Sequence, residues 1–256
     1  MSEVRLRRPY SIHEGDGPIV ATAIHAGHDV RDDVAVLMAL DERTRRREED
    51  PFTDGWTSIA PNRVLVHRSR FEVDLNRPPE DAVCFVPEDC WDLQVWRDEI
   101  PAAVVDESLR IYQRFYDDLH SLLEGVIDRC GHFVLFDLHS YNHRRLECPA
   151  DPEGNPEVNV GTGSVDRNRW GHVIDHFIEG MRSEGLDARE NVRFRGGHMA
   201  GWTNRLFAEH GCALAIDVKK FFMDERTGEL DREVWQRVRD ALAATLPHVL
   251  DLTGAR

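Results

Sequence analysis

The feature that most restricts the fold is the alternation of short apolar runs with longer amphipathic stretches. Apolar residues at helical spacing predict helices at 106–129, 168–183 and 231–249, and Gly131 is expected to end the first. Strands that alternate with helices are typical of an α/β sheet covered on both faces. Five apolar runs bounded by turn residues predict buried strands at 19–24, 63–67, 71–75, 133–138 and 213–218.

Length and composition favour one soluble globular domain over residues 1–256. The chain has 41% hydrophobic and 31% charged residues, and it contains no repeat or long linker. No apolar run approaches the roughly 18 residues of a membrane span, and residues 1–18 lack the apolar stretch of a secretory signal. The chain has five cysteines and no Cys-x-x-Cys pair, which disfavours a disulfide framework. This cysteine content favours a location in the reducing cytoplasm.

The formal net charge of −15 disfavours nucleic acid as a partner, because an acidic surface repels phosphates. A local basic pocket can still hold a small anionic molecule. The dense charges of residues 43–50 predict a solvated helix end or loop. Residues 148–163, rich in Pro, Gly, Asn and Asp, predict a long loop.

Two histidine sites stand where predicted strands end, and they suggest a metal centre. His25 follows the run 19–24, and His139 follows the run 133–138. Ligands of open α/β sheets bind beyond the carboxyl ends of the strands, so these sites can meet in space. A catalytic zinc ion takes three protein ligands. The third ligand is left open among His28, Glu49 and Asp54, and Asp137 is placed to orient a ligand. The alternative for each histidine is a hydrogen-bonded structural role.

The segment 68–78 alternates charged and apolar residues, which predicts a strand with one polar face. Arg70 and Arg77 flank that face and, with Asn76, are candidates to hold a substrate carboxylate, because arginine binds carboxylates through a bidentate fork. The alternative is an exposed edge strand whose charges pair with each other.

Asp217 stands within the apolar run 213–218, where an unpaired carboxylate is costly. Burial should raise its pKa and suit it to act as a general base. The alternative is a structural pair with Lys219 or an arginine. His198, after two glycines, is a candidate to polarise a substrate carbonyl or to cap a helix.

Six segments together resemble the N-formylglutamate amidohydrolase family, which is related to the zinc carboxypeptidases and aspartoacylases. They are IHAGHD at 24–29, TDGW at 53–56, SRFEVDLNRP at 69–78, FDLHSY at 136–141, RGGHM at 195–199 and AIDVKKFFMDE at 215–225. The resemblance implies a three-layer αβα fold with a mixed, mostly parallel central sheet, of the phosphorylase/hydrolase-like, zinc-exopeptidase-like type.

The resemblance also implies site residues. They are His25, Asp54 and His139 as ligands of one zinc ion, Asp217 as general base, and Arg70, Asn76 and Arg77 as the carboxylate-binding group. The family usually has a glutamate at 217 and a tyrosine at 198, where this chain has aspartate and histidine.

The implied reaction is hydrolysis of N-formyl-L-glutamate to formate and L-glutamate. Two alternatives remain open. One is a zinc carboxypeptidase or aminoacylase that acts on another N-acyl amino acid or small peptide. The other is a non-catalytic protein that binds an acidic amino acid. The sequence leaves the oligomeric state open.

Overall fold

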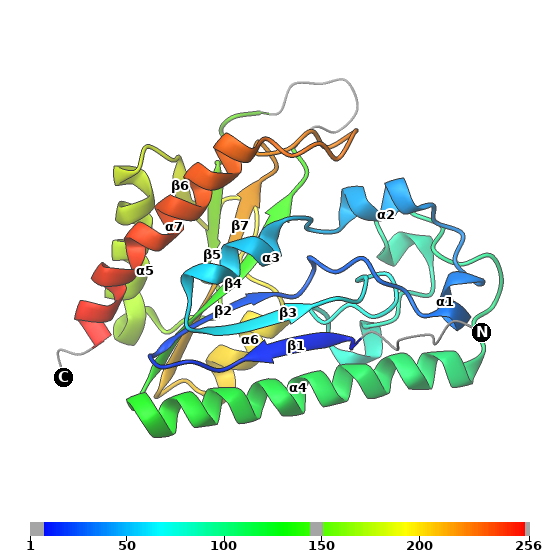
Figure 1. The fold of residues 1–256 in the computed structure, drawn as a ribbon, viewed down its shortest axis with the longest axis horizontal. Helices are drawn as coiled ribbons and strands as arrows, with labels where there is room; N and C mark the ends of the chain where they lie inside the picture. The colour runs from blue at the N-terminus through cyan, green and yellow to red at the C-terminus, as the bar shows by residue number, and fades with distance from the viewer. Residues whose placement is uncertain (1–7, 144–150, 254–256) are drawn as a thin grey trace.

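A single seven-stranded sheet organises the computed structural model, which describes residues 8–143 and 151–253 (Figure 1). The order is β1-β3-β2-β4-β7-β5-β6. Only β1 against β3 and β5 against β7 are antiparallel, so the sheet is mixed and mostly parallel, as the resemblance implied. The strands are β1 (Tyr10–His13), β2 (Ile19–Ala23), β3 (Asn62–Val66), β4 (Phe133–Tyr141), β5 (Val158–Gly161), β6 (Ala188–Glu190) and β7 (Gly211–Lys219).

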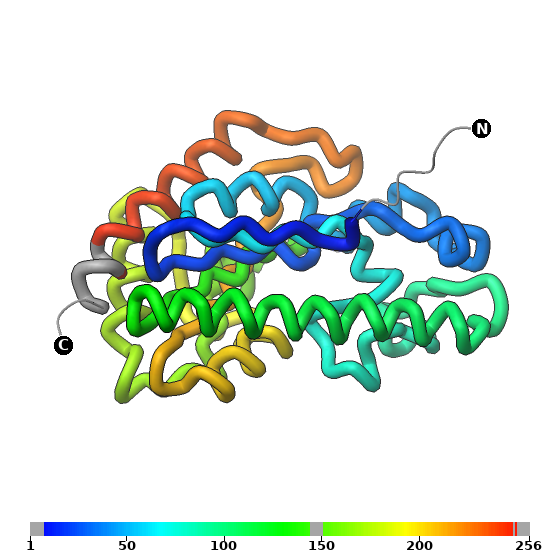
Figure 2. Tube along the Cα trace, turned by 60° about the horizontal axis from the view of Figure 1, so that its bottom comes forward, coloured from blue at the N-terminus to red at the C-terminus, as the bar shows by residue number. Residues whose placement is uncertain are grey.

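Helices cover both faces of the sheet. The helices are α1 (Asp32–Ala35), α2 (Glu42–Glu48), α3 (Thr53–Trp56), α4 (Ala102–Cys130), α5 (Arg167–Ser183), α6 (His198–Leu206) and α7 (Arg232–Thr253). Helices α5 and α7 pack on one face, and α4 and α6 pack on the other (Figure 1). Figure 2 shows the long helix α4 passing from one end of the molecule to the other. The three-layer αβα prediction is confirmed.

The central strand β4 shows why both faces must be covered. All nine of its residues are buried, and they alternate between the two cores. Phe136 and Leu138 pack with α5 and α7, whereas Phe133 and Leu135 pack with α4 and α6. A continuous apolar run is therefore what a doubly covered strand requires.

Most predicted elements are confirmed. The strands at 19–24, 63–67, 133–138 and 213–218 and all three helices are present within a few residues of their expected ends. Helix α4 begins earlier than expected, at Ala102, directly after Pro101. It ends at Gly131, whose φ of 79° lies in the left-handed region that favours glycine.

The predicted strand at 71–75 is wrong. The chain turns there instead, with the amide of Glu72 donating to the carbonyl of Ser69 and the amide of Arg77 to that of Asp74. The polar residues are as buried as the apolar ones: Glu72 and Asp74 are 0% and 4% exposed. Ion pairs with Arg31 and Arg70 stabilise these carboxylates inside the protein. The alternation of charged and apolar residues thus reflects two buried environments, one of ion pairs and one of apolar side chains, rather than a half-exposed strand.

Three smaller expectations also need correction. The predicted loop 148–163 contains the strand β5, and its residues 148–150 lie outside the described residues, as do residues 1–7 of the N-terminal segment. Cys84 and Cys90 form a disulfide, although the cysteine pattern had made a disulfide framework unlikely. The charged segment 43–50 is helical as far as Glu48, but Glu49 and Asp50, which follow the helix, are buried rather than solvated. Among residues 8–143 and 151–253, no helix has the length and apolarity needed to cross a bilayer.

Candidate active site

One cavity of about 260 Å³ lies where the neighbouring parallel strands β2, β4 and β7 bring their carboxyl ends together. Its lining combines residues from segments far apart in the sequence. Among them are His25, Asp50, Arg70, Asn76, His139, Arg193, Asp217 and Lys220. The volume suits a small metabolite rather than a polymer.

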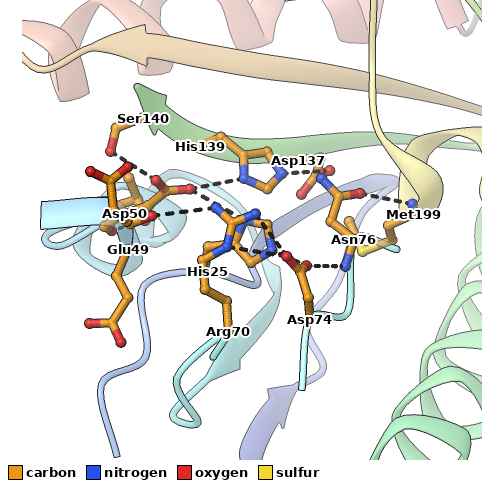
Figure 3. Close-up of polar contacts among 12 residues, drawn as sticks. His25, Glu49, Asp50, Arg70, Asp74, Asn76, Asp137, His139, Ser140 and Met199 are labelled. Carbon is orange, nitrogen blue, oxygen red and sulfur yellow. Dashed lines mark hydrogen bonds and ion pairs between the residues drawn. The ribbon is translucent and has the colours of Figure 1, made fainter. Parts of the chain in front are cut away.

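His25, Asp50 and His139 form a buried group in which single ligand atoms all lie within 4.8 Å of one another. Nδ1 of His139 lies 3.0 Å from Oδ2 of Asp50, and Nδ1 of His25 lies 3.6 Å from the same oxygen. Figure 3 shows the two imidazole rings directed toward Asp50. The predicted meeting of His25 and His139 is therefore present in the structure.

A carboxylate stands behind each imidazole. Oδ1 of Asp74 lies 2.7 Å from Nε2 of His25, and Oδ2 of Asp137 lies 2.9 Å from Nε2 of His139 (Figure 3). The hydroxyl of Thr22 donates to the other oxygen of Asp137. Carboxylates in this position fix the ring orientation of metal-binding histidines. Both rings consequently present Nδ1 to the space beside Asp50.

These donors fit a divalent cation. Nδ1 of His25 is buried and has no hydrogen-bond partner. Zinc–ligand bonds of about 2.0–2.1 Å in a tetrahedron separate the ligand atoms by about 3.3 Å, and the distances of 3.0 and 3.6 Å bracket that value. Three carboxylates surround two imidazoles, so the local charge favours a cation.

The pKa values of His139 and Asp50 also favour a cation at this site. Burial disfavours charged forms here, yet the carboxylates of Asp137 and Asp50 hold the pKa of His139 well above its usual range. Although burial opposes it, His139 and His25 hold the pKa of Asp50 well below its usual range. The site therefore favours positive charge even when protons are the only cations bound.

The third member of the group is Asp50, whereas the resemblance pointed to Asp54. Asp54 is exposed in the first turn of α3. The chain reverses between the two residues through Phe52, whose φ is 70°. The other candidates, His28 and Glu49, pair with each other, with Nδ1 of His28 2.5 Å from the Glu49 carboxylate.

Two of the three expected carboxylate-binding residues line the cavity. Arg70 stacks on the ring of Trp91 at 4.6 Å and binds Asp74 through Nη2 at 2.8 Å. Asn76 accepts a hydrogen bond from the amide of Met199, which holds its side chain at the cavity wall (Figure 3). Arg77 lies outside the cavity, where its Nη2 donates to the carbonyl of Asp89.

Asp217 is paired in register with His139 across β4 and β7, and it lines the same cavity. Its Oδ2 accepts a hydrogen bond from Nδ2 of Asn159 at 3.2 Å. Burial raises the pKa of Asp217 to about 6. Its neighbour Lys219 donates instead to the carbonyl of Asn155. The structure therefore supports an available carboxylate rather than a structural ion pair.

His198 is the first residue of α6, but its ring lies away from the cavity lining. Its Nε2 is 3.1 Å from the hydroxyl of Tyr112, and its ring meets the ring of Tyr116 edge to face. Asn76, rather than His198, accepts the hydrogen bond of a backbone amide in the first turn of α6. This geometry favours a packing role for His198 over contact with a substrate carbonyl.

Sequence reasoning missed Asp50, Arg193 and Lys220. Asp50 follows the charged helix α2 and stands immediately before Pro51 and Phe52, and that change from charged to apolar residues was the available signal. Lys220 is 1% exposed and donates from Nζ to the carbonyls of Arg47 and Glu49, which fixes the backbone that carries Asp50. No sequence pattern distinguishes Arg193 from its neighbours Arg189 and Arg195.

Comparisons with known proteins identify the family of this chain. The family described as N-formylglutamate amidohydrolase matches residues 17–223. An N-formylglutamate deformylase from Pseudomonas putida is 27% identical over 211 residues, which are 74% of this chain and 75% of that protein.

Two solved structures share the fold. An N-formylglutamate amidohydrolase from Ralstonia eutropha JMP134 has a TM-score of 0.77 at 16% identity, over 96% of this chain and 97% of that chain. A gene product from Agrobacterium tumefaciens has a TM-score of 0.68 at 15% identity, over 94% and 96%. Because the family match covers most of its length, the chain belongs to the N-formylglutamate amidohydrolase family, whose members are hydrolases of amide bonds.

Proposed function

We propose that this chain is a zinc-dependent amidohydrolase that converts N-formyl-L-glutamate and water into formate and L-glutamate. The observation that carries the proposal is the buried group of His25, Asp50 and His139, with a carboxylate behind each imidazole. The substrate is suggested by the family and by the name of the Pseudomonas putida relative.

Nδ1 of His25, Nδ1 of His139 and the carboxylate of Asp50 would hold the metal. A zinc ion there supplies Lewis acidity toward a carbonyl and makes a water molecule more acidic. Asp74 and Asp137 keep the two imidazoles oriented toward it. Lys220 fixes the backbone before Asp50 through two carbonyls.

Asp217 moves the proton. Its carboxylate takes a proton from the attacking water as the new C–O bond forms at the formyl carbon. It then gives that proton to the leaving nitrogen as the C–N bond breaks. A pKa of about 6, raised by burial, suits both steps near neutral pH.

Arg70 and Asn76 hold the carboxylate of the amino acid. The guanidinium of Arg70 is fixed by Asp74 and Trp91, and the amide of Asn76 is fixed by the first turn of α6. Fixed donors reduce the entropic cost of orienting the amide bond toward the metal and Asp217.

The proposal is tested by metal analysis combined with an assay of formate release from N-formyl-L-glutamate, before and after chelation. We expect one zinc per chain, and activity that is lost on chelation and restored by zinc. Zinc without formate release would redirect the search to other N-acyl amino acids. A protein without zinc and without activity would favour a non-catalytic binding protein.

A further inference from the structure

Arg193 is a cation on the cavity wall to which the proposed reaction assigns no role. Its guanidinium lies over the rings of Tyr141 and Phe194, at 5.0 and 5.4 Å from their centres. Its backbone amide donates to Oδ1 of Asn159, the residue whose Nδ2 also binds Asp217. Arg193 is therefore held in a defined place beside the general base.

Among the described residues, the polar groups that meet the guanidinium of Arg193 are neutral. Nη1 donates to the neutral side chain of Asn155 at 3.0 Å, and Nε is buried without a hydrogen-bond partner. Within residues 8–143 and 151–253, no carboxylate forms a salt bridge with it. By contrast, Arg70 on the same cavity binds Asp74 at 2.8 Å. Arginine binds carboxylates through a planar, bidentate fork, so this guanidinium on the cavity wall is suited to bind a carboxylate of a ligand.

The order of the sheet places Arg193 and Arg70 on different sides of the reacting groups. Arg70 follows β3 and Arg193 follows β6, while His25, His139 and Asp217 come from β2, β4 and β7 between them. Both arginines line one cavity of about 260 Å³. A small molecule with its amide over the metal group would meet one guanidinium on either side, which suits a substrate that carries two anionic groups.

We propose that Arg193 is the specificity residue of this enzyme and binds a carboxylate on the side chain of the amino acid. Arg70 and Asn76 take the α-carboxylate, and Arg193 takes the second one. This inference rests on the proposed function. It adds that discrimination between acidic and neutral substrates resides in one side chain.

The test compares formate release from N-formyl-L-glutamate and N-formyl-L-glutamine, whose side chains have nearly the same shape but end in a carboxylate and a neutral carboxamide. We expect wild-type kcat/KM to favour the glutamate compound by about 10- to 100-fold, the range of a charge-assisted hydrogen bond. Arg193→Gln should remove this preference by slowing the glutamate compound, and Arg193→Lys should keep part of it.

Arg195→Gln is the matched control, because Arg195 is an exposed arginine two residues away that does not line the cavity. It should keep the wild-type preference. Thermal unfolding of each variant shows whether it is folded, and Arg193→Lys provides the test if Arg193→Gln is not.

A preference for glutamate that survives in folded Arg193→Gln, or a wild-type enzyme that treats both compounds equally, would overturn the role of Arg193 while leaving the proposed function intact. A zinc-loaded wild-type protein that hydrolyses neither compound would overturn both.

Discussion

Asp50 and Asp54 stand four residues apart and provide a sharp test of the metal site. Asp50 is buried beside both imidazoles, and Asp54 is exposed in α3. We expect Asp50→Asn to weaken zinc binding by more than about 100-fold, since even residues behind the ligands contribute 10- to 100-fold. Asp54→Asn should bind zinc as the wild type does. Competition with a chromogenic chelator measures both, and a loss of affinity in Asp54→Asn alone would restore the ligand set implied by the resemblance.

The proposed role of Asp217 as general base predicts that activity falls at acid pH. The carboxylate is active only when deprotonated, and burial raises its pKa to about 6. A bound divalent cation favours the ionised form. We therefore expect kcat/KM to fall with decreasing pH at an inflection of about 6 or below.

Asp217→Asn should lower kcat by about 100- to 10,000-fold, the usual contribution of a general base. It should also abolish the acid limb in any residual activity. Full activity in the zinc-loaded variant would exclude Asp217 as the base.

At the scale of elements, the start of α6 is built around Asn76. The amide of Met199 donates to Oδ1 of Asn76 at 3.0 Å. A Cβ on Gly197 would lie 2.3 Å from the same side-chain amide, so Gly197→Ala must displace Asn76. We expect a rise in KM that exceeds the fall in kcat, together with a lower Tm.

Gly201→Ala is the control within the same helix. A Cβ at Gly201 would meet nothing within 4 Å, and alanine is favoured over glycine in a helix interior by up to about 1 kcal/mol. This variant should be slightly more stable and kinetically normal. Equal kinetic effects of the two substitutions would mean that Asn76 does not link α6 to substrate binding.

The elements that could be predicted from sequence are those whose buried apolar residues form a continuous run or recur at regular spacing. The apolar runs of β4 and β7 and the helical spacing of α4 are of this kind. Residues 71–75 misled because alternation cannot distinguish solvent from a buried ion pair such as that of Arg70 and Asp74. The short strand β5 was hidden because Pro156 and the surrounding polar residues resemble a loop.

The site itself was only partly predictable. His25 and His139 could be found because each follows or ends an apolar run. Asp50 had only the change from charged to apolar residues after it as a signal, because its place beside the histidines depends on how the chain turns at Phe52. Arg193 had no signal, since its position depends on the packing of Tyr141 with Phe194. Contacts between segments so far apart leave no local pattern.

At the scale of the whole molecule, metal removal should reduce stability. The buried carboxylates of Asp50, Asp74 and Asp137 lie around the same two imidazoles, and a bound cation offsets their repulsion. A ligand that binds only the folded state at 1,000 times its Kd adds about 4.1 kcal/mol to the free energy of unfolding. We expect the Tm of the metal-free protein to rise on titration with zinc. The same titration of Asp50→Asn should produce little change, and an equal rise would place the binding elsewhere.

Asp74 has a consequence for how the two occupants of the cavity influence each other. One of its oxygens lies 2.7 Å from His25, and the other lies 2.8 Å from Arg70. A substrate anion that binds Arg70 changes the strength of the interaction between Asp74 and His25. In the same way, a metal ion on His25 changes the strength of the ion pair between Asp74 and Arg70. Thermodynamic reciprocity then requires that substrate and metal alter each other's affinity by the same factor. We therefore expect the affinity of this pocket for a metal ion to differ between the free protein and the protein with a substrate anion bound, because both ligands act on the carboxylate of Asp74.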